Sequence, residues 1–421
     1  MRVSISKSEI SGRVGAPASK SYTIRGLMCA ALSPGESEIR HPLSSDDTAA
    51  AINVLRQVGV DVRQEEALWR VGGGNFQEPD ADLFCGDSAA TLRFMTAICS
   101  LVPGECRLTA GPSLARRPVE PLVQVLKQLG VNCSYQGETA AIIVAGGRLK
   151  GGVVELPGDI SSQFVSALLL IASLAEEGMT IRLTTSLESK PYVLMTLDCL
   201  ERFGITVGCS EELDEFEVLP QRYKPAKYSV EGDWSSASYL LALGALSGET
   251  EVADLNPESL QGDKTILNFL REMGARVETN KDSVTVGKAP LRAIRADLSH
   301  CIDLLPTMAV LAAVADGVSL FVGIERARIK ESNRITALRE GLEGMGIKVV
   351  EERDRLTIAG SKPTGSVIDS KNDHRIAMAF SMLGSVVGET IISGAECVSK
   401  TYPAFWEVLK GLGGEVKISG E

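Results

Sequence analysis

The sequence has few of the residues that hold metals and no segment typical of a membrane protein. It contains three histidines (His41, His300 and His374), and its nine cysteines are scattered with no Cys-x-x-Cys pair. Zinc sites need clusters of these residues and disulfide frameworks pair their cysteines, so we expect reduced thiols and no metal site. No uncharged run approaches the ~18 residues of a spanning helix, and the opening MRVSISKSEIS lacks the apolar core of a signal peptide. We therefore expect a cytoplasmic protein with no membrane partner.

An excess of basic residues is also missing. The 421 residues include 43 Lys and Arg against 54 Asp and Glu, a net charge of −11. This balance disfavours a nucleic-acid or anionic-membrane binder, so any anion must be bound by a local group of cations. Because a chain of this length exceeds the usual size of one hydrophobic core, two domains are expected.

Two helical patterns recur along the chain at nearly constant intervals. In the first, a polar cluster leads into a helix of small and apolar residues, which stops at Gly35, Gly104, Gly178, Gly248, Gly317 and Gly388. In the second, an amphipathic helix ends in an apolar residue and then Gly59, Gly130, Gly204, Gly274, Gly346 or Gly413. Glycine suits the left-handed backbone conformation that closes a helix. After each of the first five of these glycines, two short alternating stretches around a polar turn indicate a hairpin.

These patterns predict an α/β fold of six βαβαββ units, each about 70 residues long. The first helix of a unit should be buried, and the second, being amphipathic, should cover a sheet. The sixth unit lacks a return strand, so we expect the spare N-terminal strand RVSISKS to complete it. Three units per domain place one domain at 14–228 and the other at 1–13 plus 229–421.

Polar and charged residues collect at the predicted helix N-termini. Approximate threefold symmetry would gather these ends on one face of each domain. Helix N-termini with nearby Arg or Lys bind phosphate and carboxylate well. The pattern singles out Lys20, Ser21, Arg25, Arg93, Arg117, Ser161, Ser162, Gln163, Ser189, Asp233, Asp303, Asn372, Asp373, His374, Arg375 and Lys400.

The stretch ARIKESNRI at 327–335 raises a separate question of charge. It places Arg328, Lys330 and Arg334 at the start of a predicted helix, with Glu331 among them. The positive end of the helix dipole repels cations, so an anion held between the two would explain the arrangement. Glu331, surrounded by cations, is a candidate proton-transfer group.

Several candidates also have a purely structural interpretation. Ser161, Ser162 and Asp233 are of types that cap helices, and His374 would fit an ordinary solvated helix start. Cys85 and Cys301 lie in apolar stretches that favour packing. We favour binding for the clusters as a whole because they occupy equivalent positions in a sixfold repeat.

The motifs, in their order, resemble the 5-enolpyruvylshikimate-3-phosphate synthase family over essentially the full length. They are PASKSYTIR, GDSAATLR, ARRP, GDISSQF, ESKPY, VEGDWSSAS, the Asp of CIDLLP, RIKESNR, NDHRIAM and SKTYP. The resemblance implies the enolpyruvyl transferase fold, a two-domain inside-out α/β barrel with its active site in the cleft between the domains. It also implies a monomer that needs no metal or other cofactor.

The resemblance implies transfer of the enolpyruvyl group of phosphoenolpyruvate to the 5-hydroxyl of shikimate 3-phosphate. Phosphate is released through a tetrahedral intermediate, in the shikimate pathway to chorismate and the aromatic amino acids. Shikimate 3-phosphate would be held, mainly by the domain at 14–228, through Lys20, Ser21, Arg25, Ser161, Ser162, Gln163, Ser189, Asp303 and Lys330. Phosphoenolpyruvate, mainly on the other domain, would be held by Lys20, Ala89, Arg93, Arg117, Gln163, Arg334, Arg375 and Lys400.

This reaction requires two proton-transfer groups, because the hydroxyl loses a proton while the methylene carbon gains one. The resemblance assigns the hydroxyl proton to Asp303 and the methylene proton to Glu331 assisted by Lys20. Glu331 and Lys20 both remain candidates for the second role. Arginine and lysine would stabilise the charge on carboxylate and phosphate.

Three positions depart from the family pattern. Asn333 stands where the family usually has Asp, and Asp87 stands where it usually has Asn. Ala89 replaces the Gly of many members, as in the class that tolerates the herbicide glyphosate. Since the added methyl would intrude on an inhibitor longer than phosphoenolpyruvate, we expect weakened inhibition by glyphosate.

Two other functions fit parts of the sequence. The sister enolpyruvyl transferase that acts on UDP-N-acetylglucosamine shares the fold but usually carries a catalytic cysteine in a mobile loop. No cysteine here lies in a comparable Gly- and Pro-rich loop. A non-catalytic scaffold would use the extended surfaces of six units, but it would leave Asp303, Glu331 and the clustered cations without a role.

Overall fold

The computed structural model describes residues 1–137 and 141–420 of an α/β chain. The chain divides into two compact units: the central unit, Ala18–Glu231, and the terminal unit, Met1–Pro17 with Gly232–Glu421. It therefore passes from one unit to the other after Pro17 and again after Glu231. The sequence places these two passages after residues 13 and 228.

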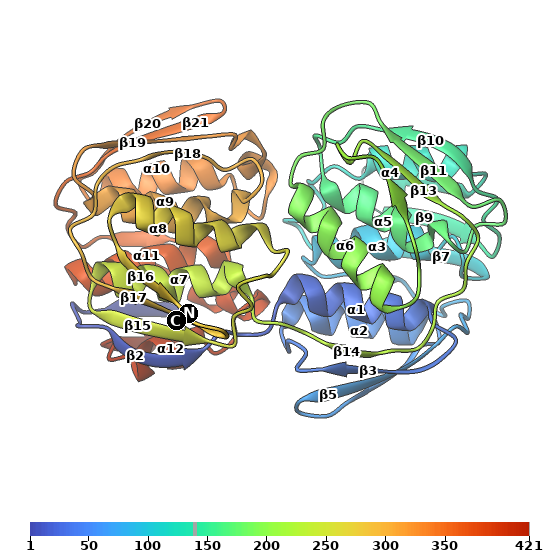
Figure 1. Cartoon of the computed structure of the whole chain (residues 1–421), viewed down its shortest axis with the longest axis horizontal. Coiled ribbons are helices and arrows are strands. Elements are labelled where there is room, and N and C mark those ends of the chain that lie inside the picture. Colours follow the sequence, from blue (N-terminus) through green and yellow to red (C-terminus); the bar gives the residue numbers. More distant parts are fainter. Residues whose placement is uncertain (138–140, 421) are drawn as a thin grey trace. The chain divides into compact units, whose positions relative to one another are not determined.

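The central unit contains six α-helices and three four-stranded sheets within its described residues (Figure 1). Its helices are α1 (Lys20–Leu32), α2 (Asp46–Gln57), α3 (Ala89–Ile98), α4 (Glu120–Gln128), α5 (Ser162–Ala172) and α6 (Lys190–Arg202). Its first sheet is formed by β14 (Lys227–Ser229), β3 (Gly35–Arg40), β5 (Leu68–Gly73) and β4 (Asp61–Gln64). The second is formed by β6 (Leu83–Phe84), β7 (Gly104–Thr109), β9 (Ala141–Gly146) and β8 (Asn132–Gln136). The third is formed by β10 (Gly152–Leu156), β11 (Met179–Leu183), β13 (Glu215–Val218) and β12 (Gly208–Cys209).

The terminal unit repeats this organisation. Its α-helices are α7 (Trp234–Leu246), α8 (Ile266–Met273), α9 (Leu305–Val314), α10 (Arg334–Gly344), α11 (His374–Val387) and α12 (Phe405–Gly411). Short 3-10 helices are η1 (Gly262–Thr265), η2 (Ile302–Leu304), η3 (Glu325–Ile329) and η4 (Ala395–Lys400). One sheet is β16 (Arg276–Thr279), β17 (Ser283–Gly287), β15 (Glu249–Ala253) and β2 (Ser11–Gly15). The others are β18 (Arg295–Asp297), β19 (Val318–Val322), β21 (Arg355–Ala359) and β20 (Lys348–Glu352), and β22 (Val367–Asp369), β23 (Thr390–Ser393), β1 (Arg2–Ile5) and β24 (Val416–Ser419).

The N-terminal strand completes the last repeat, as predicted. Strand β1 lies between β23 and β24 and is antiparallel to both, with Val3 opposite Ile392 and Ile418. In the other sheets this place belongs to the return strand of a hairpin, for example β21 between β19 and β20. The hairpins predicted after the first five amphipathic helices are also present as antiparallel pairs.

The leading strands of the first and fourth repeats differ from the expected arrangement. Strand β2 precedes α1 in sequence but pairs in parallel with β15 of the terminal unit. Strand β14 precedes α7 but pairs in parallel with β3 of the central unit. The backbone ladder needs only a free strand edge, so each leading strand joins the unit it reaches before the chain passes to the other.

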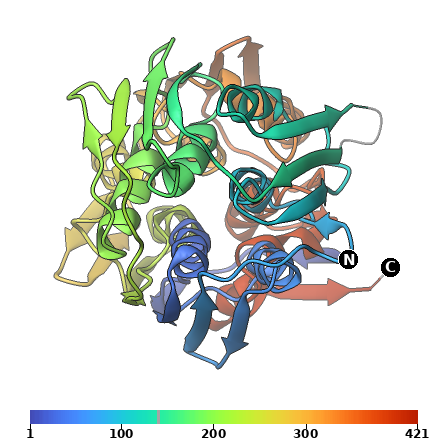
Figure 2. The same cartoon turned by 90° about the vertical axis from the view of Figure 1, so that its right-hand side faces the viewer.

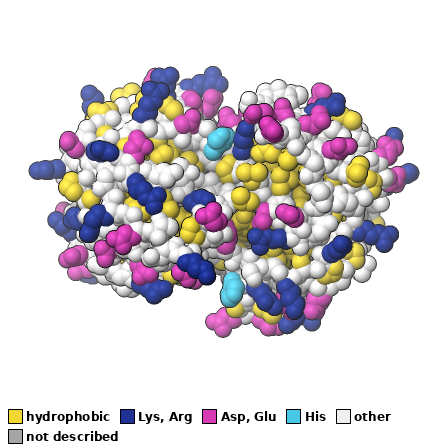
Figure 3. Space-filling model, viewed as in Figure 1, with side chains coloured by type: hydrophobic (Ala, Val, Ile, Leu, Met, Phe, Trp, Pro, Cys, Tyr) yellow, Lys and Arg dark blue, Asp and Glu magenta, His cyan; other side chains and the backbone are white. Residues whose placement is uncertain are grey.

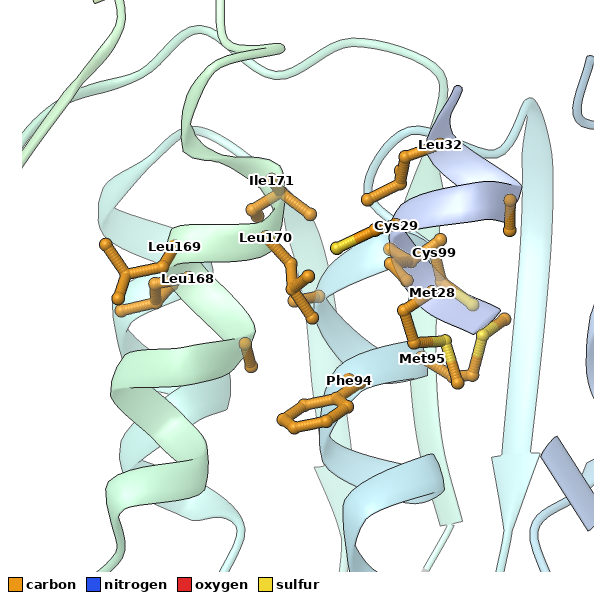
Figure 4. Packing of buried hydrophobic residues seen from close by; sticks show 14 of the residues in the cluster. Met28, Cys29, Leu32, Phe94, Met95, Cys99, Leu168, Leu169, Leu170 and Ile171 are labelled. Atoms are coloured by element: carbon orange, nitrogen blue, oxygen red, sulfur yellow. The ribbon is translucent and has the colours of Figure 1, made fainter. Parts of the chain in front are cut away.

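The first helix of each repeat forms the core, as its composition predicts. Every residue of α7 is buried, and α1, α3 and α5 of the central unit are buried over nearly all their length. Figure 4 shows side chains of α1, α3 and α5 packing together, with Met28 and Cys29 from α1, Phe94 from α3 and Leu170 from α5. Each large apolar side chain buried in this way contributes about 1.5–3 kcal/mol.

The amphipathic second helices each bury one face in this core and expose the other. Helices α2, α4, α8, α10 and α12 pack on the strands that follow them, β4, β8, β16, β20 and β24. In Figure 2 the helices of the central unit are seen nearly end-on with the hairpins around them. The prediction that the amphipathic helices cover the sheets is therefore confirmed for these five, whereas α6 packs on α5 and α1.

The glycines that follow the amphipathic helices serve the backbone. All six have positive φ, from 81° at Gly204 to 99° at Gly413. At Gly346 no atom of the described residues lies within 4 Å of the place a Cβ would take, so space is not the constraint. The left-handed conformation, which strains other residues, explains the glycine.

Charges of both signs share the surface. Figure 3 shows Lys and Arg interspersed with Asp and Glu over the visible face of each unit. This mixture agrees with the modest net charge of −11 and leaves anion binding to local clusters.

Candidate active site

Arg334 lies at the centre of a buried cluster in the terminal unit. It is the first residue of α10, which Asn333 caps by accepting a hydrogen bond from the backbone N–H of Thr336. Its side chain is 1% exposed, and Nε donates to Oδ2 of Asp373 at 2.8 Å. Nη1 donates to Oδ1 of Asp303 at 2.8 Å and Nη2 to Oε2 of Glu331 at 2.5 Å. Carboxylates thus neutralise a cation that the helix dipole would otherwise repel.

The remaining predicted cations of this unit surround the same carboxylates. Arg375 donates from Nη2 to Oδ2 of Asp303 at 3.1 Å, and Nζ of Lys330 lies 3.7 Å from Oδ1 of Asp303. Nζ of Lys400 lies 3.7 Å from Oε1 of Glu331. The structure therefore brings together the six residues of this unit that the resemblance assigns to the site, which are Asp303, Lys330, Glu331, Arg334, Arg375 and Lys400.

The cluster changes the acidity of its members in opposite directions. Burial would raise the pKa of Asp303, but Arg375, Lys330 and Arg334 lower it well below its usual range. Burial, aided by Arg334 and Arg326, lowers the pKa of Lys330 to about 8. Asp303 is thus held ionised, and Lys330 titrates close to neutral pH.

Asp373 belongs to the polar helix start at 372–375, but the sequence reasoning gave it no role of its own. It is fully buried, and it contacts Arg334 twice, the second time through Oδ1 and Nη2 at 3.2 Å. It also accepts from Oγ of Ser332 at 3.0 Å and caps α11 by accepting from the backbone N–H of Arg375. An acid in the N-cap position before HR was the available signal, but it is equally typical of a simple cap.

Asp263 is an acid that the sequence reasoning missed. It lies buried on η1 and accepts a hydrogen bond from Oγ of Ser235. Burial, together with the charge of Asp303, raises the pKa of Asp263 to about 7. The motif GDK carries no periodic or charge signal that would have marked it.

In the central unit, Arg25 is a buried cation held by hydroxyl and carbonyl oxygens. Nε donates to Oγ1 of Thr196 at 2.8 Å, Nη1 to the carbonyl of Ser21 at 3.1 Å, and Nη2 to the carbonyl of Tyr192 at 3.0 Å. Its guanidinium also lies 5.4 Å from the ring centre of Phe94. Within the described residues no carboxylate forms an ion pair with it. A buried charge of this kind is costly unless an anion compensates it.

The side chain of Arg93 bonds two other predicted residues and the residue that follows a third, Arg117. Its Nη1 donates to Oγ of Ser161 at 3.1 Å and to Oε1 of Gln163 at 2.8 Å, and Nη2 donates to the carbonyl of Pro118 at 3.1 Å. The guanidinium stacks over Phe164 at 5.0 Å. The predicted group on α3 and α5 is therefore one connected network.

Lys20 contacts an acid that the sequence reasoning did not mark. Its Nζ lies 2.9 Å from Oδ2 of Asp47 on α2, and both side chains are largely buried. The other predicted residues of this unit lie at or near helix starts: Ser21 in α1, Ala89 at the start of α3, Arg117 shortly before α4, Ser162 at the start of α5 and Ser189 as the N-cap of α6.

The structure confirms several of the purely structural interpretations and contradicts the one for His374. Ser161 and Asp233 do cap α5 and α7, and Cys85 and Cys301 are buried, so these interpretations are confirmed. His374 as a solvated helix start is wrong, because its side chain is 1% exposed.

Arg328, two residues before Lys330, makes its contacts outside the buried cluster around Arg334. Arg328 lies in η3, and its side chain donates to Oε1 of Glu351 and to the carbonyls of Glu352 and Arg353.

Two departures from the family pattern acquire local roles. Asp87 accepts from Oγ of Ser113 at 2.7 Å and from the backbone N–H of Leu114 at 3.2 Å, so it fastens the loop that leads to Arg117. Asn333 caps α10, which either Asn or Asp can do.

The fold and the site define a class of protein. Six α/β repeats carry arginines, lysines and carboxylates at the starts of their helices, an arrangement suited to an enzyme that handles small anions. Within the described residues no helix is long and apolar enough to cross a membrane.

Comparisons with known proteins identify the family. A model of EPSP synthase (3-phosphoshikimate 1-carboxyvinyltransferase) matches residues 5–409. A 3-phosphoshikimate 1-carboxyvinyltransferase from Dehalococcoides mccartyi is 51% identical over 418 residues, 99% of each chain. One from Methanosarcina acetivorans is 42% identical over 427 residues, again 99% of each chain. The chain belongs to the EPSP synthase family.

Solved structures agree on the fold. EPSP synthase from Acinetobacter baumannii superposes with a TM-score of 0.83 at 24% identity, over 99% of this chain and all of that one. The enolpyruvyl transferase NikO from Streptomyces tendae gives 0.81 at 19% identity, over 99% of this chain and 98% of the other. The α/β fold predicted from the repeats is therefore confirmed.

Proposed function

We propose that this chain is a 3-phosphoshikimate 1-carboxyvinyltransferase. It transfers the enolpyruvyl group of phosphoenolpyruvate to the 5-hydroxyl of shikimate 3-phosphate and releases phosphate. The observation that carries the proposal is that Asp303 and Glu331, the two predicted proton-transfer groups, both bond Arg334 and are both flanked by further cations. Full-length similarity to relatives of that name supports it. Action as a monomer in the cytoplasm is part of the same proposal.

In the proposed reaction Asp303 accepts the proton of the 5-hydroxyl. Its carboxylate is ionised, as a base must be, but its cationic partners make it a weak one. Phosphoenolpyruvate carries a carboxylate and a phosphate that would compete for Arg334 and Arg375. As these cations turn to the substrate, the pKa of Asp303 rises toward its usual value and the base becomes stronger.

Glu331 is the proposed donor of the proton to the methylene carbon, with Lys20 assisting. Once it has lost its proton, Arg334 and Lys400 stabilise the resulting carboxylate. Lys400 and Arg334 would also stabilise negative charge on the phosphate group before it leaves.

The proposed binding groups are divided between the substrates. Shikimate 3-phosphate is assigned to Lys20, Ser21, Arg25, Ser161, Ser162, Gln163, Ser189, Asp303 and Lys330. Phosphoenolpyruvate is assigned to Lys20, Ala89, Arg93, Arg117, Gln163, Arg334, Arg375 and Lys400. The buried charge of Arg25, which no carboxylate of the described residues pairs, supports an anionic ligand beside it.

The test is phosphate release from purified protein mixed with both substrates, with each substrate omitted in turn. We expect release only when both are present and a loss of at least about a hundredfold for Asp303→Ala and Glu331→Ala, as for removal of an acid–base group. Glu343→Gln, which removes an exposed carboxylate from the same helix as Arg334, is the control and should retain activity. Release with UDP-N-acetylglucosamine as the acceptor, or release without an acceptor, would contradict the proposal.

A further inference from the structure

Thr196 is a buried residue of α6 to which the proposed function assigns no role. Its hydroxyl oxygen lies 2.8 Å from Nε of Arg25, 2.8 Å from Oγ of Ser166 on α5 and 3.1 Å from the carbonyl of Tyr192. Nε of arginine can only donate, so the threonine oxygen accepts from it and its own proton goes to Ser166 or Tyr192. The direction of this hydrogen bond is therefore fixed.

The contacts of Arg25 leave a defined part of its guanidinium for a ligand. Of its five N–H groups, three are donated, one each to Thr196, to the carbonyl of Ser21 and to the carbonyl of Tyr192. One N–H remains on each Nη nitrogen, the number that a bidentate contact with a carboxylate or phosphate uses. Phe94 and Tyr192 lie over the guanidinium, at 5.4 and 5.9 Å to the ring centres. The guanidinium is therefore restrained at one edge by Thr196 and over its face by the rings of Phe94 and Tyr192.

We infer that Thr196 is a positioning residue, which orients the guanidinium of Arg25 toward the anionic group of shikimate 3-phosphate. The inference rests on the proposed function, which assigns Arg25 to that substrate. Without the hydroxyl, a buried charged donor loses its acceptor and the guanidinium is free to turn. The loss falls on the binding of one substrate, because the hydroxyl of Thr196 bonds Arg25, Ser166 and the carbonyl of Tyr192, none of which is a predicted acid or a predicted phosphoenolpyruvate cation.

The test compares Thr196→Val, which keeps the shape and removes the hydroxyl, with Thr196→Ser, which keeps the hydroxyl. We expect Thr196→Val to raise the KM for shikimate 3-phosphate roughly ten- to a hundredfold, with little change in the KM for phosphoenolpyruvate or in kcat. Thr196→Ser should stay within about threefold of wild type. Thr96→Val is the matched control, because Thr96 is a buried helical threonine of the same unit whose hydroxyl donates to the carbonyl of Leu92 in its own helix.

The outcomes separate the two proposals. An active wild type whose Thr196→Val variant keeps the KM for shikimate 3-phosphate, or raises both KM values alike, overturns the positioning role alone. A wild type that neither releases phosphate nor binds shikimate 3-phosphate in calorimetry overturns the proposed function and this inference with it. If Thr196→Val does not fold, the same comparison is made with Thr196→Ala against Thr196→Ser. Equal affinities for shikimate 3-phosphate in that pair would also overturn the inference.

Discussion

Replacing Asp373 with Asn tests whether the buried charge cluster stabilises the terminal unit. Arg334 makes four charged hydrogen bonds, two of them to Asp373, and both residues are almost completely buried. Removing one partner of a buried pair typically costs about 3–5 kcal/mol. Asp303 and Glu331 remain as partners and Asn can still accept, so we expect a loss of about 2–3 kcal/mol for Asp373→Asn.

A second substitution separates the charge from the helix cap. Asn is a good capping residue, so Asp373→Asn should keep the hydrogen bond to the backbone N–H of Arg375 at the start of α11. Asp373→Ala loses the cap as well, which should cost about 1 kcal/mol more. The difference between the two variants therefore measures the cap, and the difference between Asn and wild type measures the charge.

Differential scanning calorimetry at pH 7 provides the measurement. For a unit of this size, about 2–4 °C is lost per kcal/mol, so Asp373→Asn should lower the Tm by roughly 4–12 °C. If the two units unfold separately, only the transition of the terminal unit should move. Asp316→Asn removes an exposed acid from the same unit and should change stability by less than about 0.5 kcal/mol. An Asp373→Asn transition within about 1 °C of wild type would refute the electrostatic reasoning.

Three further predictions concern activity. Because the pKa of Lys330 is about 8, kcat/KM for shikimate 3-phosphate should fall about fivefold from pH 8 to pH 9 as the lysine loses its charge. Lys330→Arg, which stays charged, should abolish that fall in a pH profile, and an unchanged profile would contradict the assignment. Ala89→Gly should increase inhibition by glyphosate, because it removes the methyl group that would intrude on the inhibitor. The steric argument would be refuted if glyphosate already inhibited the wild type strongly and Ala89→Gly left the inhibition curve unchanged. Asp87→Asn should leave the KM for phosphoenolpyruvate within about threefold, because the amide oxygen can still accept from Ser113 and Leu114, while Asp87→Ala should raise it.

The sign of the lysine effect on stability is opposite to its effect on activity. The folded-state pKa of Lys330 lies below the unfolded value of about 10.4, so the unfolded chain binds more protons between about pH 8 and 10.4. This residue therefore destabilises the folded state at neutral pH and ceases to do so as the pH rises through that window. The free energy of unfolding should be measured for wild type and for Lys330→Met between pH 7 and 10. We expect a gap between the two values that narrows as the pH rises. A constant gap would contradict the shifted pKa.

The sequence by itself determined the α/β repeat, and it predicted two passages between units and the charged residues that the structure gathers around Arg334. Helix and strand periodicities are local properties of the chain, so they can be recognised in the sequence without knowing how the elements pack. The positive φ at Gly346 and its counterparts is also a local property, and it made the ends of the amphipathic helices readable. Arg334 was marked because cations at a helix start conflict with the dipole, and Glu331 because cations surround it, and both features are visible in nine residues.

Only the tertiary structure decided which strand edges meet and which charges pair. The strand at Ser11–Gly15 looks like part of the first repeat, but the ladder it joins is set by the free edge of β15. Asp373, Asp47 and Thr196 are single polar residues that resemble ordinary caps or helix positions in sequence. Their roles come from hydrogen bonds to residues 39, 27 and 171 positions away. Such contacts depend on how separate helices pack, and the energies that select them arise only when burial removes the competing water.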